Sequence, residues 1–478
     1  MSILRHSMYN LFGAAVPVAV SLLTVPIYLH VIGLDRYGIL SLCWLVVGYL
    51  NFFDLGLGRA TAQRIAALHE AGEEDRARSF WAGMSLSTGL ALLSLAVAWP
   101  VAQFALGSIK ATAELRSEIA AALPLLMVAI PVAILQSSLK GALEGRREFL
   151  LINAIVSAGA LATGVLPLAA AMLMGPDLAI LVAMSLLVRV VVLIAYAVAC
   201  ARLLPIRRFV LPAAQDLRRM LHFGAWLTVT NVASMIVFVD RFLIGAIVGA
   251  AAVAIYVIPF NLMNQMLLLP SALSNALFPR LAASADRRPL TRQALFETSL
   301  ILTPVALCAI VVVGPFLRLW IGSGPAAAAA PVAYVLALGV WANGLAQLPF
   351  ASLQAAGRTD LTGKLHLVEV LPYLGLLWLG LSTIGILGAA LAWTMRVAVD
   401  FIALAILDRI GMKVLGRIFV QAVALIALAL TMLLTPADSM TRWVVASAIC
   451  IATALYSLAI MPRSMVERAQ AVLRSARS

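Results

Sequence analysis

Long apolar stretches, separated by short polar segments, run through almost the whole chain. Each stretch has about 20 residues or more, which is the length that an α-helix needs to cross a bilayer. The pattern predicts an all-α polytopic membrane protein with about fourteen transmembrane helices. No polar segment is long enough for a soluble domain, so the chemistry must lie in the membrane array or on its loops. The helices are predicted at residues 8–32, 36–57, 79–106, 119–139, 150–174, 179–201, 222–248, 252–279, 294–317, 327–352, 365–382, 385–407, 418–436 and 441–461.

Composition and charge support a membrane location and give an orientation. The chain is 63% hydrophobic and 12% charged, whereas soluble domains carry roughly 25% charged residues. Of the 34 Lys and Arg residues, 26 lie at the two termini and in loops after even-numbered spans, and five lie in loops after odd-numbered spans. This bias predicts that both termini are cytoplasmic. Because the basic residues form no single patch, the net charge of +13 does not indicate nucleic acid. The four cysteines and five histidines have no metal-binding or disulfide spacing, so no metal or cofactor is predicted.

The chain has an internal repeat. Ile32–Ile39 resembles Val248–Ile255, and Leu139–Arg146 resembles Leu353–Arg358. The sixth and twelfth spans carry Arg189 and Arg396 at matching depth. Two six-helix bundles follow, and a pseudo-two-fold axis along the membrane normal should relate them, since both bundles enter from the same side. The predicted domains are residues 1–205, residues 206–410, and residues 411–478 with two extra C-terminal helices and a basic tail.

The first clearly polar segment is Phe52–Arg78. Two glycines end the second span, and a short surface helix is predicted over Ala60–Ala71. Asp54 and Arg59 flank the glycines on the cytoplasmic side. A clasp between their side chains would close an inward gate, and a plain surface loop that obeys the charge bias is the alternative reading.

These residues carry a family resemblance. Tyr37-Gly38 and Phe53-Asp54-Leu55-Gly56-Leu57-Gly58-Arg59-Ala60 resemble the polysaccharide-biosynthesis transporters, above all the O-antigen and exopolysaccharide repeat-unit flippases. That family belongs to the superfamily of multidrug extruders and lipid II flippases. The resemblance implies two bundles around a polar cavity that opens alternately to each side of the bacterial inner membrane. The implied substrate is an oligosaccharide linked through pyrophosphate to undecaprenol, moved to the periplasmic leaflet against a counter-flow of protons or another cation. It also implies a monomer among membrane lipids, beside a polymerase and other polysaccharide-assembly proteins.

Two arginines within spans are the main candidates for binding the pyrophosphate. An Arg at the bilayer centre costs at least about 2.5 kcal/mol and normally faces a cavity or a partner. Its guanidinium pairs phosphate oxygens bidentately. We expect Arg189 and Arg396 to line the lumen. Pairing inside each bundle is the alternative, and for Arg396 the partner would be Asp400, at i+4 on the same helix face. Amides that could bind sugar hydroxyls, or instead bridge helices, are Asn261, Asn264, Gln265, Asn343 and Gln347.

Acidic residues within spans are candidates for ion coupling. Asp240 follows a long apolar run and could carry a proton or sodium, although a plain ion pair with Arg241 is an equal reading. His366 and Glu369 lie one helical turn apart and could titrate together, with Asp400 as a further carboxylate.

Two other classes of protein are alternatives to a flippase, an antiporter and an enzyme. A drug or small-cation antiporter of the same superfamily would favour carboxylates and aromatics in its lumen, whereas here Arg189 and Arg396 lie near the middle of their spans. A membrane-embedded polymerase, ligase or glycosyltransferase would need a large outer loop or an acidic catalytic motif. The longest outer loop is only about Gly107–Glu118. An enzyme is therefore not predicted.

Overall fold

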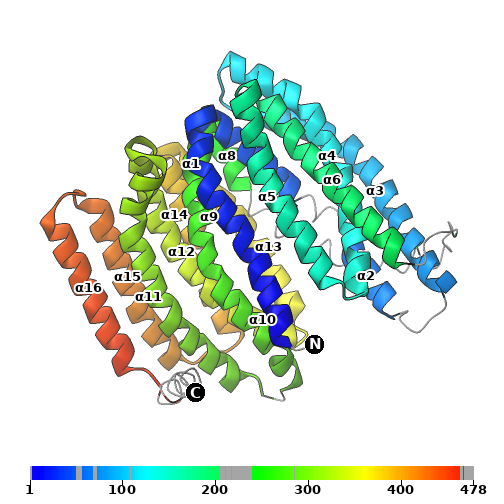
Figure 1. The fold of residues 1–478 in the computed structure, drawn as a ribbon. Coiled ribbons are helices and arrows are strands. Elements are labelled where there is room, and N and C mark those ends of the chain that lie inside the picture. Colours follow the sequence, from blue (N-terminus) through cyan, green and yellow to red (C-terminus); the bar gives the residue numbers. More distant parts are fainter. Residues whose placement is uncertain are drawn as a thin grey trace, which may run out of the picture. The chain divides into compact units, whose positions relative to one another are not determined.

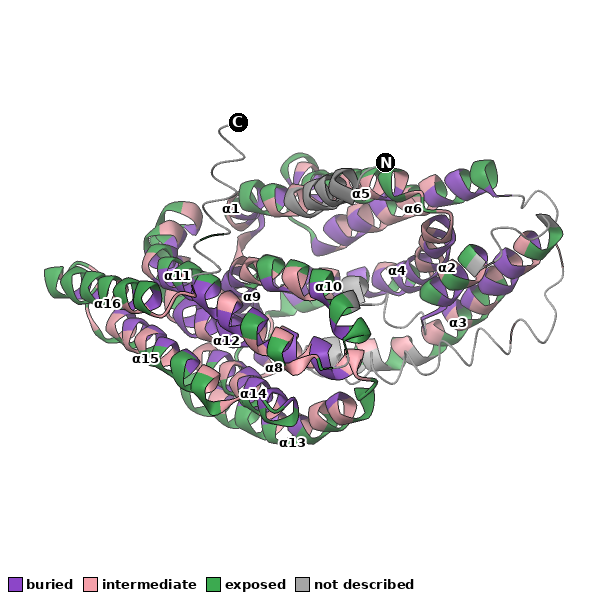
Figure 2. Cartoon of the chain, turned by 90° about the horizontal axis from the view of Figure 1, so that it is seen from below, coloured by how far each residue is buried: buried purple, intermediate pink, exposed green. Residues whose placement is uncertain are grey.

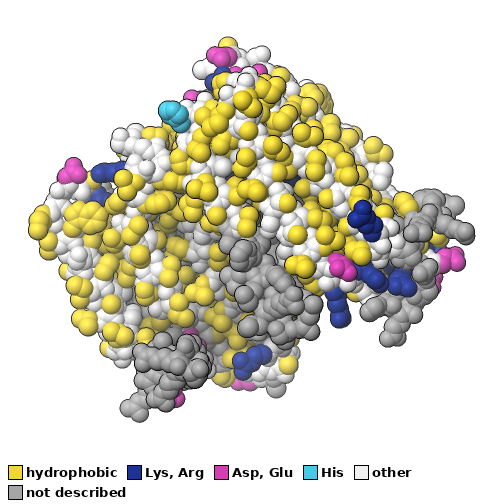
Figure 3. Space-filling model, in the orientation of Figure 1, with side chains coloured by type: hydrophobic (Ala, Val, Ile, Leu, Met, Phe, Trp, Pro, Cys, Tyr) yellow, Lys and Arg dark blue, Asp and Glu magenta, His cyan; other side chains and the backbone are white. Residues whose placement is uncertain are grey.

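The computed structural model describes residues 3–49, 56–67, 73–107, 109–204, 210, 217, 239–284, 286–462 and 467. Within this part the regular structure is helical, and twelve helices are long and apolar enough to cross a membrane. Hydrophobic side chains cover much of the visible surface (Figure 3). The chain divides into two compact units, Met1–Ala254 and Ile255–Ser478. The predicted boundaries at residues 205 and 410 stay predictions.

In the first unit, α4 is the central helix. It packs against α2, α3 and α6, whereas α5 packs against α1 and α6 (Figure 1). The predicted short helix over Ala60–Ala71 is present as α2, which begins at Leu57 and is described up to Ala67. It packs on the end of α4, a contact that the sequence did not predict. The helices of this unit are α1 (Ile3–Tyr49), α2 (Leu57–Ala67), α3 (Glu73–Gly107), α4 (Ala113–Gly145), α5 (Phe149–Met174), α6 (Leu178–Leu203) and α8 (Val239–Ile247).

The first two predicted spans follow each other inside α1. Gly33, with φ of 78°, interrupts the helix between them, and this left-handed region is one that side chains other than glycine rarely adopt. Past the kink, Tyr37 and Trp44 form an aromatic cluster with Tyr28. The hydroxyl of Tyr28 donates to the carbonyl of Gly164 at 3.0 Å and so fixes α1 against α5. Most of the predicted span 222–248 lies outside the described residues.

In the second unit, α12 is the most buried helix and α16 is largely exposed (Figure 2). α12 packs against α10, α11, α14 and α15. Trp341 Nε1 donates to Thr303 Oγ1 at 3.0 Å, and Thr303 hydrogen-bonds Gln421 on α15, which attaches the extra C-terminal pair to the bundle. The helices are α9 (Ala250–Asn264, which crosses the unit boundary), the 3-10 helix η3 (Gln265–Leu267), α10 (Leu268–Ala283), α11 (Arg288–Ile321), α12 (Ser323–Ala355), α13 (Thr359–Ile384), α14 (Ile386–Leu407), α15 (Met412–Leu434) and α16 (Met440–Ala459).

The two helices that end in the predicted repeat motifs, α4 and α12, have the same kind of C-terminal turn. After α4, the amide of Glu148 donates to Leu143 O and that of Arg147 to Glu144 O. After α12, the amide of Arg358 donates to Leu353 O and that of Gly357 to Gln354 O. Both are Schellman endings, with Arg147 and Gly357 in the left-handed region at φ of 63° and 72°. The two helices therefore end in the same backbone turn, although the turns match Arg147 with Gly357, whereas the Gly-Arg endings of the sequence repeat match Gly145 with Gly357.

Candidate functional site

A cavity of about 730 Å³ lies within the first unit, between α2, α4, α5 and α6. Its wall on α4 follows the spacing of one helix face, from Gln136 through Lys140 to Glu144. α6 contributes Arg189 and Tyr196. The full lining is Gly56, Gly58, Arg59, Gln136, Ser137, Lys140, Gly141, Glu144, Ile155, Val156, Gly159, Thr163, Val188, Arg189, Val192 and Tyr196.

Glycines bring the backbone of α2 directly onto α4. A Cβ atom on Gly141 would collide with the carbonyl oxygen of Gly58, and one on Gly145 would lie 2.7 Å from the carbonyl oxygen of Ala62. The Gly-x-x-x-Gly spacing on α4 thus forms the seat for α2. Because Arg59 follows Gly58 in the chain, this contact also places Arg59 at the cavity wall. Gly58-Arg59, from the segment that carries the family resemblance, and the repeat motif Leu139–Arg146 therefore meet at this crossing.

The cavity has an excess of positive charge. Arg59, Lys140 and Arg189 face a single carboxylate, Glu144, which leaves a net charge of +2. The Lys140 Nζ lies 3.5 Å from a Glu144 oxygen. Within the described part of the chain, neither the Arg59 nor the Arg189 guanidinium makes an ion pair or hydrogen bond. Of the sequence candidates, Arg59 and Arg189 are therefore brought together in one cavity.

The polar neighbour of Arg189 on α4 bonds its backbone carbonyl and not its guanidinium. The Gln136 amide donates to the carbonyl of Arg189 at 2.6 Å, so α4 and α6 are tied at the level of this arginine. Gln136, Lys140 and Glu144 were missed by sequence reasoning. Their signal was present, because residues spaced by four lie on one helix face and this face leads into the motif at Leu139–Arg146.

A second set of charged residues lies in the second unit, between α13 and α14. Arg396 Nη2 lies 3.4 Å from a carboxylate oxygen of Glu369, and His366 Nε2 lies 3.5 Å from a carboxylate oxygen of Asp400. Both pairs are largely buried; Glu369 is 8% exposed and Asp400 is 7% exposed. The Arg396 guanidinium also lies 5.7 Å from the centre of the Tyr373 ring. The partner of Arg396 is thus a carboxylate on the neighbouring helix rather than Asp400 on its own helix.

Close backbone contact positions these charges. A Cβ atom on Gly380 would lie 2.7 Å from the carbonyl oxygen of Gly388, so α13 and α14 cross with almost no side chains between them. Neither oxygen of Glu369 makes a hydrogen bond within the described residues. Two carboxylates, one guanidinium and one imidazole therefore share a small, poorly solvated space where a proton or cation could be taken up.

The other candidates are spread over different places. Asp240 is fully buried, and its Oδ1 accepts hydrogen bonds from the Arg241 amide at 2.7 Å and the Arg241 guanidinium at 3.1 Å. Asn261 and Asn264 are exposed, and Gln347 is half-buried. Asp54, the proposed gate partner of Arg59, lies outside the described residues.

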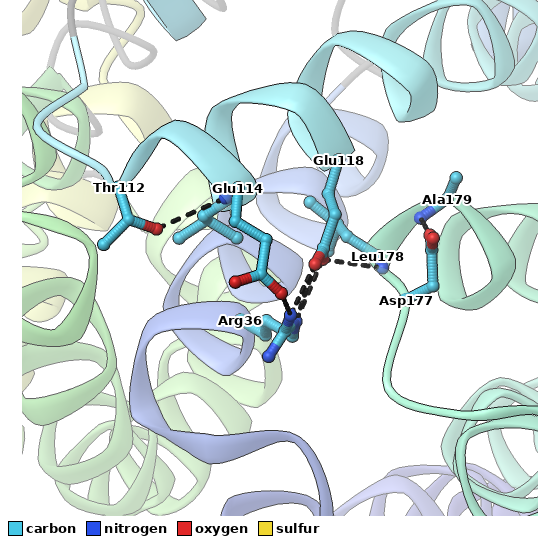
Figure 4. Close-up of polar contacts among 8 residues, drawn as sticks. Arg36, Thr112, Glu114, Glu118, Asp177, Leu178 and Ala179 are labelled. Carbon is cyan, nitrogen blue, oxygen red and sulfur yellow. Dashed lines mark hydrogen bonds and ion pairs between the residues drawn. The ribbon is translucent and has the colours of Figure 1, made fainter.

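At the opposite end of the first unit from α2, an ion pair and a backbone hydrogen bond join three segments through Glu118. Arg36 Nε donates to Glu118 at 2.9 and 3.1 Å, and its NH2 donates to Glu114 at 3.0 Å (Figure 4). Glu118 also accepts from the amide of Leu178 at 3.1 Å, at the start of α6. The kink of α1 and the first turns of α4 and α6 are thus held together by one carboxylate.

The turn between α8 and α9 is attached at the same end. Asp35 accepts from the amide of Ala251 at 3.1 Å, and Gly38 packs on the backbone of Ala250. Lys110 caps the end of α8 by donating its Nζ to the carbonyl of Ile247 at 2.6 Å. The two turns that the sequence repeat relates, at Ile32–Ile39 and Val248–Ile255, are therefore in contact with each other.

Comparison with known proteins adds to this geometry. A family described as "Polysaccharide biosynthesis protein" matches residues 3–284. A Shigella flexneri protein, provisionally named an O-antigen transporter, is 30% identical over 412 residues, covering 84% of this chain and 97% of that protein. The lipid II flippase MurJ in an inward closed conformation has a similar fold, with a TM-score of 0.73 at 15% identity, covering 97% of this chain and 100% of that one. An inward-facing multidrug transporter of the MATE family has a TM-score of 0.68 at 14% identity, covering 84% and 98%.

Proposed function

The chain belongs to the polysaccharide biosynthesis protein family, and on that premise we propose that it is a flippase for oligosaccharides linked through pyrophosphate to undecaprenol. It would carry a repeat unit from the cytoplasmic to the periplasmic leaflet of the bacterial inner membrane, with both termini in the cytoplasm. The observation that carries this proposal is the cavity of net charge +2 in the first unit.

The charge of the cavity matches the head of such a substrate. A pyrophosphate esterified on both sides carries two negative charges, which Arg59, Lys140 and Arg189 can balance. Arginine binds phosphate oxygens through two parallel hydrogen bonds, and an arginine inside a span needs an anion or a water-filled cavity to offset its burial. Because the described structure gives the Arg189 guanidinium no partner, a bound phosphate would supply one.

The volume of the cavity limits what it holds. At about 730 Å³ it falls in the range of about 300–1,000 Å³ that is typical of sites for drug-sized ligands. It can accept a pyrophosphate with one or two sugars, while the remaining sugars and the isoprenoid tail stay outside. The hydroxyl and amide groups of Thr163, Tyr196 and Gln136 are suited to the first sugar.

The charges between α13 and α14 are our candidates for coupling transport to a cation. Glu369 and Asp400 offer two carboxylates. The contact pair of His366 and Asp400 also changes its net charge when the imidazole takes a proton. Counter-flow through this group would drive alternating access, in which the contacts of Asp35 and Lys110 with the α8–α9 turn break as that end opens. As a working arrangement we propose a monomer that receives its substrate from the membrane and delivers it to a polymerase.

Export of small cations is the second candidate function. It is favoured by the two buried carboxylates in the second unit, which would attract a cation, and by the fold shared with MATE transporters. The positive cavity argues against this candidate, because Arg59, Lys140 and Arg189 would repel a cationic substrate.

Replacement of Arg189 tests the proposal. In a strain that lacks its own repeat-unit flippase, we expect Arg189→Ala to reduce polysaccharide export at least tenfold and Arg189→Lys to reduce it less. Arg202→Ala is the matched control, because Arg202 lies exposed in the last turn of the same helix, outside the cavity. Wild-type export by the correctly inserted Arg189→Ala variant would overturn the proposal, and cation efflux that depends on Glu369 would favour the second candidate.

A further inference from the structure

The carboxylate of Glu144 is out of place in a cavity for anions. It belongs to the last turn of α4 and lines the same space as Arg59, Lys140 and Arg189. Its partner is Lys140, one helical turn earlier, at 3.5 Å. The side chains of Lys140 and Glu144 are 44% and 36% exposed, so an incoming ligand can reach both. Glu144 therefore forms an ion pair with the lysine that a phosphate would otherwise bind.

We infer that Glu144 is a release residue, which competes with the pyrophosphate of the bound substrate for Lys140. This inference rests on the proposed function of the cavity and concerns how tightly that cavity holds its ligand. When the substrate binds, its phosphate displaces Glu144 from Lys140. When Glu144 returns to Lys140, the cavity loses one of its three cationic contacts and the substrate is freed.

The physical reason lies in the balance that any transport site requires. A site must bind its ligand strongly enough to collect it and weakly enough to release it. Three cations without an opposing acid would form a trap for a doubly charged group. A tethered carboxylate beside one of them lowers the affinity and provides a replacement partner, so Lys140 is never left without an anion during release. Since an exposed Lys–Glu pair at i,i+4 is weak, the exchange in either direction is easy.

The inference predicts opposite changes in affinity and turnover. Glu144→Gln removes the competing charge while retaining the size of the side chain and the helix. We expect this variant to bind a farnesyl-pyrophosphate-linked sugar about three- to tenfold more tightly than wild type, and to translocate it more slowly at saturating concentration. Both KM and kcat therefore fall. A variant that is merely damaged would lose affinity or leave it unchanged.

Two further variants separate the exchange from a general effect of charge. Glu148→Gln removes an acid from the turn that follows α4, where Glu148 does not line the cavity, and we expect wild-type affinity and turnover. In the double variant Lys140→Gln/Glu144→Gln the gain in affinity should disappear, because the lysine that Glu144 releases is absent. The gain in the single variant should also shrink at high salt, as expected for partly exposed charges.

Binding and transport are measured with the same probe, on full-length protein in phosphatidylcholine nanodiscs and in vesicles. Unchanged or weaker binding by Glu144→Gln, while wild type binds the probe in an Arg189-dependent manner, would overturn the inference and leave the proposed function standing. If wild-type binding did not depend on Arg189, the proposed function itself would fail. Tighter binding that persists in the double variant would also overturn the inference.

Discussion

Arg189 and Arg396 occupy matching positions in the sequence repeat but different electrostatic settings. Arg396 is paired with Glu369 at 3.4 Å, and both side chains are largely buried. The guanidinium of Arg189 has no such partner among the described residues and lines a cavity. Removing an arginine from a buried pair leaves its partner's charge uncompensated, whereas an arginine that faces a cavity is available to a ligand. The two residues should therefore respond differently to the same substitution.

We predict that Arg396→Ala destabilises the protein by about 3 kcal/mol or more, because it leaves the Glu369 carboxylate buried without its partner. Arg189→Ala should change the stability by much less, since it leaves no opposite charge behind. The measurement is thermal unfolding of the purified protein in detergent. The double variant Arg396→Met/Glu369→Gln should recover most of the loss, and a loss of stability equal to that of Arg396→Ala would contradict the assignment.

The residues in the left-handed region after α4 and α12 should respond in opposite directions to substitution. Arg147 has φ of 63°, and the equivalent position in the turn after α12 is Gly357. Since a non-glycine residue is strained there, Arg147→Gly should stabilise the protein by up to about 1 kcal/mol, and Gly357→Ala should destabilise it by a similar amount. Thermal unfolding checks both variants. Shifts of the same sign would show that the two turns are not equivalent.

Sequence reasoning identified which residues carry charge within the spans but not which of them meet. The i,i+4 spacing of Arg396 and Asp400 is visible in the sequence. The approach of Glu369 to Arg396 depends instead on how α13 lies on α14, which the contact between Gly380 and Gly388 fixes. Single-sequence patterns do not contain that register. The i,i+4 spacing of Lys140 and Glu144 is likewise visible in the sequence, but the cavity that their face of α4 lines depends on how α2 packs on that helix.

At the scale of elements, the seating of α2 on α4 is the feature that assembles the cavity. Gly141→Ala would place a methyl group against the carbonyl of Gly58. We predict a loss of about 1–3 kcal/mol in stability, as is typical for overpacking, and a marked loss of export because Arg59 moves with α2. Gly89→Ala is the control, since a Cβ there meets no atom within 4 Å. Wild-type export and stability in Gly141→Ala would contradict this seating.

The pair α13–α14 is the element that we expect to respond to the ion gradient. In vesicles with an imposed pH gradient, Glu369→Gln and Asp400→Asn should each abolish most of the gradient-driven transport while leaving probe binding in the other unit unchanged. The reason is that each substitution removes a carboxylate that would carry the proton or cation. Transport in both variants at the wild-type rate would exclude this pair as the coupling site.

For the whole chain, the hydrophobic pattern predicted the helical membrane fold, and the repeat related the ends of α4 and α12 but not the register in which their turns match. Gly33 breaks α1 at the predicted boundary between the first two spans, but the pattern could not show whether a kink or a loop separates them, because both have the same apolar flanks. Nor could it predict that the turns at Ile32–Ile39 and Val248–Ile255 would meet. The two turns resemble each other, but contact between them depends on how α8 and α9 pack.

The contacts at this end of the first unit should hold one conformation of the transport cycle. Asp35 and Lys110 bind backbone groups of the α8–α9 turn, so they can be removed without altering that turn itself. A few hydrogen bonds shift a two-state equilibrium by several-fold or more. We predict that Asp35→Ala and Lys110→Ala, separately and more strongly together, increase the reaction of a cysteine placed at Ile247 with a membrane-impermeant thiol reagent added to whole cells. Arg116→Ala removes a nearby charge that makes no ion pair with a described residue, and it should leave the labelling rate unchanged. Labelling that stays at the background rate in the double variant would mean that these contacts do not close this end of the molecule.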